Sequence, residues 1–204
     1  MSTPHSISRS QQLLTLLTAC LAVLILPASL TGTSVAIPQI NAELHPGLVE
    51  LQWVVNAYNL TFAAFMLISG SLADILGRKR VFIFGTTLFA VCSLASVLAN
   101  NILLLDVARG LSGVGAAAMM TAGSALLAQA YTGEQLAKAF AIFGSAAGAG
   151  LAIGPSLSGF LVGLAGWRSV FGLHLAVSIV ILLLTVGVPA GQEAPGTSRI
   201  DWAG

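Results

Sequence analysis

Three ionisable side chains inside apolar runs are the first candidates for chemistry in this sequence. Charged residues make up only 7% of the 204 residues, and hydrophobic residues make up 56%. Asp106 and Arg109 lie three residues apart in one apolar run, and His174 lies in another. A guanidinium inside a membrane segment costs about 2.5 to 3.5 kcal/mol, so Arg109 should face a cavity or a partner, for which Asp106 is available. Each residue also has a purely structural alternative. Arg109 could form an ion pair that only holds helices together, and His174 could be a neutral histidine that hydrogen-bonds to a neighbouring helix.

A second group of charges lies between two apolar runs, in the stretch from Gly70 to Arg80. It contains Asp74 and then three cations, which include Arg78 and Lys79. The cations are typical of a short turn that orients a chain in a membrane. Asp74 falls near the C-terminal end of an expected helix, where the helix dipole disfavours a carboxylate. We therefore expect a partner for it, either the N-terminus of another helix or a local cap or ion pair.

Membrane-spanning helices must position these side chains. A charged fraction of 7% excludes an ordinary soluble domain, in which about 25% of residues are charged. A spanning helix needs about 20 mostly apolar residues. Six windows qualify: 13–37, 51–73, 81–99, 102–130, 139–165 and 169–188. The prediction is an all-α membrane protein with a cytoplasmic N-terminus (1–12), a six-span bundle (13–188) and a polar linker (189–204), with Pro38, Pro46, Gly77 and Gly166 at the breaks between windows.

The positive charges predict the orientation and exclude several classes of function. If both termini are cytoplasmic, the inner segments hold Arg9, Arg78, Lys79, Arg80, Lys138 and Arg199, and the outer loops hold only Arg168. We therefore expect a multi-pass protein of the plasma (cell inner) membrane. The cations form no basic face for nucleic acid. Cys20 and Cys92 lie in apolar runs and are not expected to bind metal, and no catalytic motif is present, so we expect neither an enzyme nor a cofactor.

Four stretches, taken in chain order, resemble signatures of the major facilitator superfamily. Residues 28–38 with QWVVNAY (52–58) resemble its 14-span drug:proton antiporter branch. GSLADILGRK (70–79) resembles the loop 2–3 signature, with Ile75 where a basic residue is common. RGLSGVGA (109–116) resembles the arginine motif, with Ser112 in place of Gln, and GLAIGPSLSG (150–159) resembles the antiporter motif, with Ser158 in place of Gly.

The resemblance implies a fold and a set of roles. The superfamily has two six-helix bundles, each made of two inverted three-helix repeats, with the substrate between the bundles. This chain would be one bundle, and its partner would be a missing C-terminal half. The implied roles are proton coupling or cavity lining by Asp106, Arg109 and His174; a gating loop of Gly70, Asp74, Gly77, Arg78 and Lys79; a helix hinge of Gly150, Gly154, Pro155 and Gly159; and a substrate cavity lined by Thr31, Ser34, Asn56, Tyr58 and Asn59.

The resemblance further implies a transporter that exports small amphipathic compounds or drugs through the lipid bilayer, driven by the proton gradient, by alternating access. The alternatives are a superfamily transporter of sugars or metabolites, and a truncated fragment that transports nothing. One departure bears on the coupling, because the branch usually has an acidic residue in span one where this chain has Ser29, and an Asn where it has Ser34. Coupling then falls to Asp106 or to the missing half, or is absent.

Overall fold

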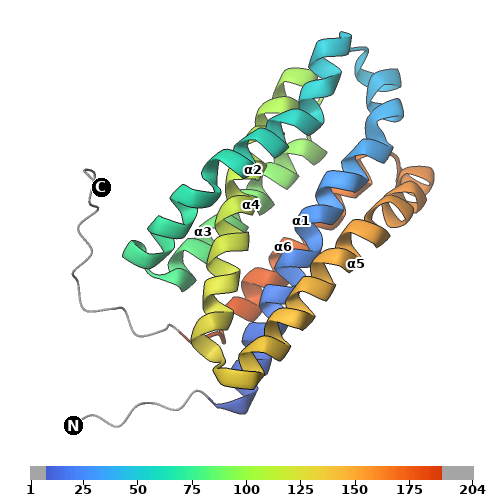
Figure 1. Cartoon of the computed structure of the whole chain (residues 1–204). Coiled ribbons are helices and arrows are strands. Elements are labelled where there is room, and N and C mark those ends of the chain that lie inside the picture. Colours follow the sequence, from blue (N-terminus) through green and yellow to red (C-terminus); the bar gives the residue numbers. More distant parts are fainter. Residues whose placement is uncertain (1–7, 190–204) are drawn as a thin grey trace, which may run out of the picture.

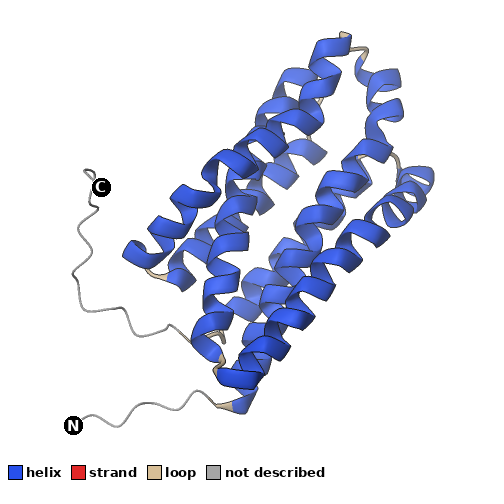
Figure 2. Ribbon diagram, in the orientation of Figure 1, coloured by secondary structure: helices blue, strands red, loops and turns tan. Residues whose placement is uncertain are grey.

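The computed structural model describes residues 8–189, which form six long helices joined by short connections (Figures 1 and 2). The helices are α1 (Arg9–Leu44), α2 (Leu48–Leu76), α3 (Arg78–Val97), α4 (Ile102–Ala130), α5 (Gly133–Ala165) and α6 (Arg168–Thr185). All six are long and apolar enough to cross a membrane. Of the three predicted regions, the N-terminus (1–12) and the linker (189–204) lie mostly outside the described residues.

The helix ends follow the local sequence. Ser8 begins α1 with a capping box, in which its hydroxyl accepts a hydrogen bond from the Gln11 backbone while the Gln11 side chain accepts one from the Ser8 backbone. Gly77 alone separates α2 from α3 and has φ 95°. Residues with a side chain rarely adopt that conformation, so a glycine is needed there. The predicted loop from Gly70 to Arg80 is therefore wrong in extent, because every residue around Gly77 is helical.

The first span is also longer than predicted. The break expected at Pro38 is absent, and α1 continues to Leu44. Contacts with the end of α5 and the start of α6 hold this last part: Gln39 donates to the Val162 carbonyl at 3.4 Å, and Glu43 accepts hydrogen bonds from Trp167 and Arg168. Proline is tolerated in membrane helices when tertiary contacts of this kind support the surrounding backbone.

The helix contacts follow the pattern of an inverted repeat. The most extensive pairs are α2 with α4, α1 with α5, and α3 with α4, and α3 also packs on α6. An inverted repeat relates α1 to α4, α2 to α5 and α3 to α6. Exchanging each helix for its counterpart turns the α2–α4 pair into α5–α1, which is again a major pair, and the two helices lie side by side in Figure 1. The same exchange turns α3–α4 into α6–α1, also in contact. The prediction of one bundle built from two three-helix repeats is confirmed.

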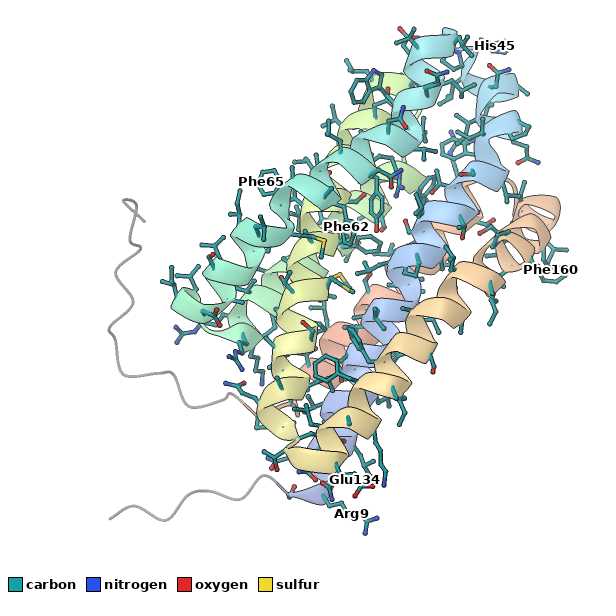
Figure 3. All side chains as sticks on the ribbon, viewed as in Figure 1. Arg9, His45, Phe62, Phe65, Glu134 and Phe160 are labelled. Carbon is teal, nitrogen blue, oxygen red and sulfur yellow. The ribbon has the colours of Figure 1, made fainter. Side chains whose placement is uncertain are left out.

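The two ends of the bundle hold different connections. We call the end at which α1 begins and α6 ends the terminal end; it also holds the α2–α3 and α4–α5 connections (Figure 1). The far end holds the other three connections and His45 (Figure 3). The least buried helices are α2 and α5. Their side chains Phe65 and Phe160 point away from the bundle on opposite sides (Figure 3), and 37% and 64% of their surfaces are exposed.

Most buried hydroxyl groups in the bundle are satisfied within their own helix. Each donates to the carbonyl oxygen four residues earlier, as Thr86 does to Phe82 at 2.8 Å and Thr33 to Ser29 at 2.6 Å. The same bond is made by Thr15, Thr18, Ser93, Ser96, Ser178 and Thr185. These residues need no polar partner on a neighbouring helix, and so they fit an apolar interior.

Candidate functional site

Arg109 lies at the centre of the bundle, in the middle of the contacts between four helices. Only 1% of its surface is exposed. Its Nε donates to the Val54 carbonyl on α2 at 3.0 Å, and its Nη1 donates to the Ser29 hydroxyl on α1 at 3.0 Å. The guanidinium lies over the Tyr58 ring, 4.3 Å from its centroid, and 5.8 Å from that of Phe171 on α6. One backbone carbonyl, one hydroxyl group and two aromatic rings thus surround this positive charge.

Asp106 does not neutralise this charge. Among the described residues, no ion pair joins Arg109 to a carboxylate; the guanidinium Nη2 and the Asp106 Oδ1 are both buried and have no hydrogen-bond partner. The partnership suggested by their spacing is therefore not formed in this conformation. A buried charge without a counter-ion is costly, and such groups concentrate at functional sites. The two residues that carry these atoms lie three positions apart on α4.

His174 is the third buried polar side chain of this cluster. It is 2% exposed, and its ring lies 6.0 Å from the rings of Phe171 and Phe89, measured between centroids. Its Nδ1 has no hydrogen-bond partner. Phe171 therefore has Arg109 on one side and His174 on another, so the structure brings these two predicted residues close together. Whether either carries protons stays a prediction.

The predicted cavity residues do not form one group. Tyr58 is buried, and its hydroxyl donates to the Leu26 carbonyl at 3.2 Å, so it belongs to the surroundings of Arg109. Thr31 and Asn59 are half-buried, and Thr31 lies against α5 beside Gly154. Ser34 and Asn56 are both exposed. A shared substrate cavity for all five residues remains a prediction.

The predicted gating residues lie at the terminal end, where they hold three helices together. Arg78 contacts Asp74 at 3.5 Å and donates to the Ala125 carbonyl on α4 at 3.1 Å. Lys79 donates to the carbonyls of Val186, at 3.3 Å, and Val188, at 2.6 Å, just after α6. The ammonium group thus binds free carbonyls at the C-terminal end of a helix, where a positive charge is favourable.

The Asp74 side chain keeps 66% of its surface exposed. Gly70 has open space around it.

The predicted hinge residues on α5 form its packing face against α1. A Cβ atom at Gly150 would collide with the Leu24 carbonyl oxygen, and one at Gly154 would collide with the Thr31 hydroxyl. Gly159 is less constrained, because the nearest atom would be a Val35 methyl at 3.8 Å. Small residues of this kind let membrane helices approach closely. Pro155 lies within the unbroken helix α5, and the hinge itself stays a prediction.

Sequence reasoning named Tyr58 but missed two other neighbours of Arg109, Val54 and Phe171. The Val54 carbonyl is a backbone atom, so no residue type could have indicated it. Phe171 is one of nine phenylalanines and carries no positional signal. Thr61 was also missed: its hydroxyl lies 2.7 Å from the Gly110 carbonyl, where α2 and α4 approach. Ser29 did have a signal, because it stands where the antiporter branch usually has an acid.

A further polar cluster closes the far end. Glu43, at the end of α1, accepts hydrogen bonds from Trp167 Nε1 at 2.8 Å and Arg168 Nη1 at 2.6 Å. Arg168 also donates to the Ala99 carbonyl at 2.8 Å, and its guanidinium lies 4.2 Å from the centroid of the Trp167 ring. The cluster therefore connects the ends of α1 and α3 to the start of α6, and so links the two three-helix repeats.

We expect Glu43→Gln to lower the thermal unfolding midpoint of the protein by a few degrees. The amide keeps one acceptor oxygen for the two donors, and the buried Trp167 N–H then competes with Arg168 for it. Circular dichroism in detergent measures the shift. The control is Glu134→Gln, which breaks an exposed ion pair with Lys138 and should change nothing measurable. Equal midpoints for both variants would contradict a stabilising role for the cluster.

Known proteins resemble this chain in both sequence and fold. Residues 19–201 match the Major Facilitator Superfamily. The chain belongs to the Major Facilitator Superfamily. Relatives include the multidrug resistance protein Stp of Mycobacterium tuberculosis (strain CDC 1551 / Oshkosh), which is 38% identical over 86% of this chain and 33% of its own length. The drug efflux pump JefA of the same strain is 35% identical over 95% of this chain and 38% of its own length.

Other relatives agree with this membership. The multidrug transporter protein MdtP of Bacillus subtilis (strain 168) is 34% identical over 93% of this chain and 35% of its own length. The crystal structure of the peptide transporter POT superimposes with a TM-score of 0.70 at 21% identity, over 84% of this chain and 37% of that one. At that identity the likeness concerns the fold alone. The chain thus spans about a third of the length of the superfamily relatives that it matches.

Proposed function

We propose that this chain forms the N-terminal half of a proton-driven exporter of small amphipathic compounds. The observation that carries the proposal is the similarity to relatives whose names state multidrug resistance or drug efflux, at 34% to 38% identity. The chain matches about a third of their length, so a second bundle would supply the other side of the substrate site. The two halves would rock about a site near the middle of the membrane.

The composition of the bundle supports an amphipathic substrate. A surface with few charges suits apolar compounds better than phosphorylated ones. The faces of α2 and α5 carry many exposed apolar side chains, among them Leu60, Leu67, Leu151 and Leu157. In the proposal these faces meet the second bundle and border the substrate path. We expect no enzymatic activity and no bound cofactor.

Proton coupling is proposed for Asp106 and Arg109. The Asp106 Oδ1 is buried and unpartnered, and Arg109, three residues along the same helix, has an Nη2 that also lacks a partner. A carboxyl group in such a place is a suitable proton carrier, because its charge state changes how well it can pair with Arg109. Protonation would weaken that pairing, and deprotonation would favour it. His174 is a second candidate, because its Nδ1 has no hydrogen-bond partner and its ring lies beside Phe171, as the Arg109 guanidinium does.

The terminal end would form the cytoplasmic gate. The distribution of positive charges favours both termini on the cytoplasmic side of the plasma membrane, with only Arg168 on the outer side. Asp74 is held by Arg78 but still exposed, so it could face the positive N-terminus of a helix in the second bundle. Breaking that contact would open the cytoplasmic side.

Efflux measurements test the proposal. In cells that lack their main drug pumps, the complete protein should lower the accumulation of ethidium, an amphipathic cation. For exchange of one proton per substrate, a gradient of about one pH unit supports a concentration ratio of about tenfold. A protonophore should abolish that ratio. Efflux that persists unchanged after the gradient collapses would contradict proton coupling, and no efflux of any amphipathic compound would contradict the substrate class.

A further inference from the structure

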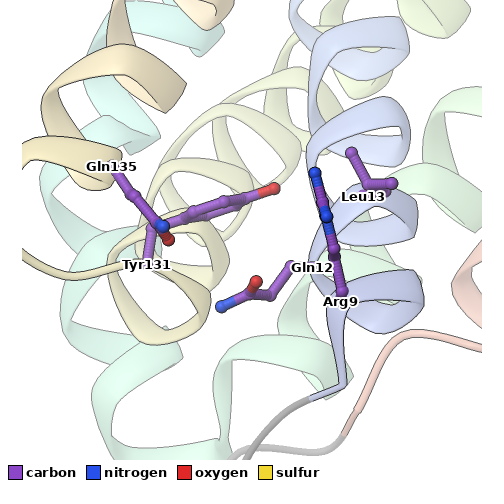
Figure 4. A pocket seen from close by; sticks show the side chains of 5 residues that line it. All are labelled: Arg9, Gln12, Leu13, Tyr131 and Gln135. Carbon is purple, nitrogen blue, oxygen red and sulfur yellow. The ribbon is translucent and has the colours of Figure 1, made fainter.

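A pocket opens at the terminal end of the bundle, between the start of α1 and the α4–α5 connection. Its volume is about 500 Å³, and it is lined by Arg9, Gln12, Leu13, Tyr131 and Gln135 (Figure 4). Arg9 and Leu13 come from the first turns of α1, whereas Tyr131 precedes α5 and Gln135 lies in its first turn. The pocket is remote from Arg109, and the proposed transport mechanism does not use it.

The lining residues are suited to an anion. Arg9 supplies a guanidinium, and Tyr131 and Gln135 supply hydroxyl and amide donors, whereas the Gln12 amide already donates to the Ala130 carbonyl at 2.8 Å. In Figure 4 the Tyr131 hydroxyl points across the pocket towards α1. Burial raises the pKa of the Tyr131 phenol, so the hydroxyl keeps the proton that it would donate. None of the five lining residues is acidic.

Two helix dipoles add to the positive potential, and one opposes it, because α4 ends at Ala130 beside Tyr131 with its negative C-terminal end. Helices α1 and α5 both begin beside the pocket, so both direct their positive ends towards it. The N-cap residue of α5, Thr132, makes no side-chain hydrogen bond to the first turn. Backbone N–H groups at such an end are available to an anion. One negative charge lies nearby, on Glu134, and it is paired with Lys138 at 2.8 Å (Figure 3).

The pocket continues into an apolar strip along α1. Leu13 lines it, and Leu17 lies one turn further along the helix; 58% and 50% of their surfaces are exposed. A polar site for an anion is thus continuous with an exposed hydrocarbon surface that runs along a membrane-spanning helix. A soluble anion would use only the first part, whereas a phospholipid has a chemical group for each.

We propose that this pocket binds the anionic headgroup of a membrane phospholipid, with its acyl chains against Leu13 and Leu17. Arg9 binds the phosphate with the fork of its guanidinium. The Tyr131 hydroxyl and the Gln135 amide hydrogen-bond to the remaining phosphate or glycerol oxygens. Basic pockets between helices at the cytoplasmic side of a membrane are suited to such headgroups. The lipid would fix the start of α1 against the α4–α5 connection.

Lipid binding to the purified protein tests the proposal. The protein in a neutral detergent is mixed with phosphatidylglycerol, or with phosphatidylcholine of identical acyl chains, and bound lipid is counted by native mass spectrometry. We expect phosphatidylglycerol to be retained preferentially. Arg9→Gln should reduce its apparent affinity by about fivefold, the contribution of one cation near an anionic lipid. Arg9→Lys should restore part of the loss, which shows that the effect comes from charge.

Matched controls separate the pocket from general charge and from free phosphate. Arg80→Gln removes one cation from the same end of the bundle outside the pocket, and should leave the preference unchanged. Tyr131→Phe should weaken phosphatidylglycerol binding and leave phosphatidylcholine unaffected. Equal binding of the two lipids, or equal losses in the Arg9 and Arg80 variants, would overturn the proposal. Displacement of the lipid by millimolar inorganic phosphate would also overturn it, because the pocket would then be a site for a small anion. These outcomes do not depend on transport activity.

Discussion

Gly150→Ala should destabilise the bundle by about 2 to 3 kcal/mol, although alanine is the better helix former. A Cβ atom at this position would collide with the Leu24 carbonyl oxygen of α1 and would lie 2.9 Å from the Leu24 carbonyl carbon. Both are backbone atoms in a helix, so they cannot rotate away as the end of a side chain can. The two helices would have to separate along an interface that also contains Gly154 and Gly32.

Gly148→Ala is the matched control for this prediction. Gly148 lies on the same helix two residues earlier, and a Cβ atom there would meet nothing within 4 Å. Its substitution should leave the thermal midpoint unchanged or raise it, by up to about 1 kcal/mol in stability, because alanine favours the helix. Thermal unfolding of both variants in the same detergent measures the difference. Equal midpoints would show that the α1–α5 interface is looser than the structure describes.

Arg109→Met should lower the rate of proton-driven export by at least about tenfold, while the protein still folds. Replacing a buried charge by an apolar side chain of similar length is often neutral for stability, because the cost of burying the charge disappears with the bonds. The substitution leaves the Val54 carbonyl and the Ser29 hydroxyl without their donor. It also removes the group with which Asp106 would pair.

Two further variants sharpen this result. Arg109→Lys keeps the charge, but a single ammonium group lacks the planar fork that reaches both α1 and α2, so we expect only partial export. Thr86→Val is the control, because the Thr86 hydroxyl donates only to its own helix and export should be normal. Efflux rate and thermal midpoint are measured for each variant. Normal proton-driven export by Arg109→Met would contradict a role for Arg109 in coupling.

The sequence predicted the helices well because the apolar runs and their breaks are local properties. The window 102–130 coincides with α4, where Asn101 caps the first turn with its side chain. Prediction failed at Pro38, because distant side chains decide whether the chain stays helical after a proline. Trp167 and Arg168, which hold Glu43, are more than 120 residues away in the sequence.

The candidate site was predicted by residue type, and its arrangement was not. Charge in an apolar run was enough to select Arg109, because a guanidinium inside a membrane span is costly unless it faces a cavity or a partner. The spacing to Asp106 suggested a pair, yet the guanidinium turns towards α1 and α2, and the Asp106 Oδ1 has no hydrogen-bond partner. Which acceptor a long side chain chooses depends on helix rotation and on backbone atoms. Neither is written in the spacing of residues on one helix.

The buried hydroxyl groups have a consequence for movement. Since threonine and serine side chains such as Thr33 and Ser93 donate within their own helices, each helix carries those hydrogen bonds with it when it shifts. A helix can then slide past its neighbour without exchanging polar partners. Polar cross-links join the helices at both ends of the bundle, through Arg78 and Lys79 at the terminal end and Glu43 and Arg168 at the far end. Between the ends, the cross-links lie around Arg109, where Tyr58 and Thr61 also bridge between helices. Inside the bundle, relative motion of the helices is therefore opposed mainly at one level, and that level is where the uncompensated charge lies.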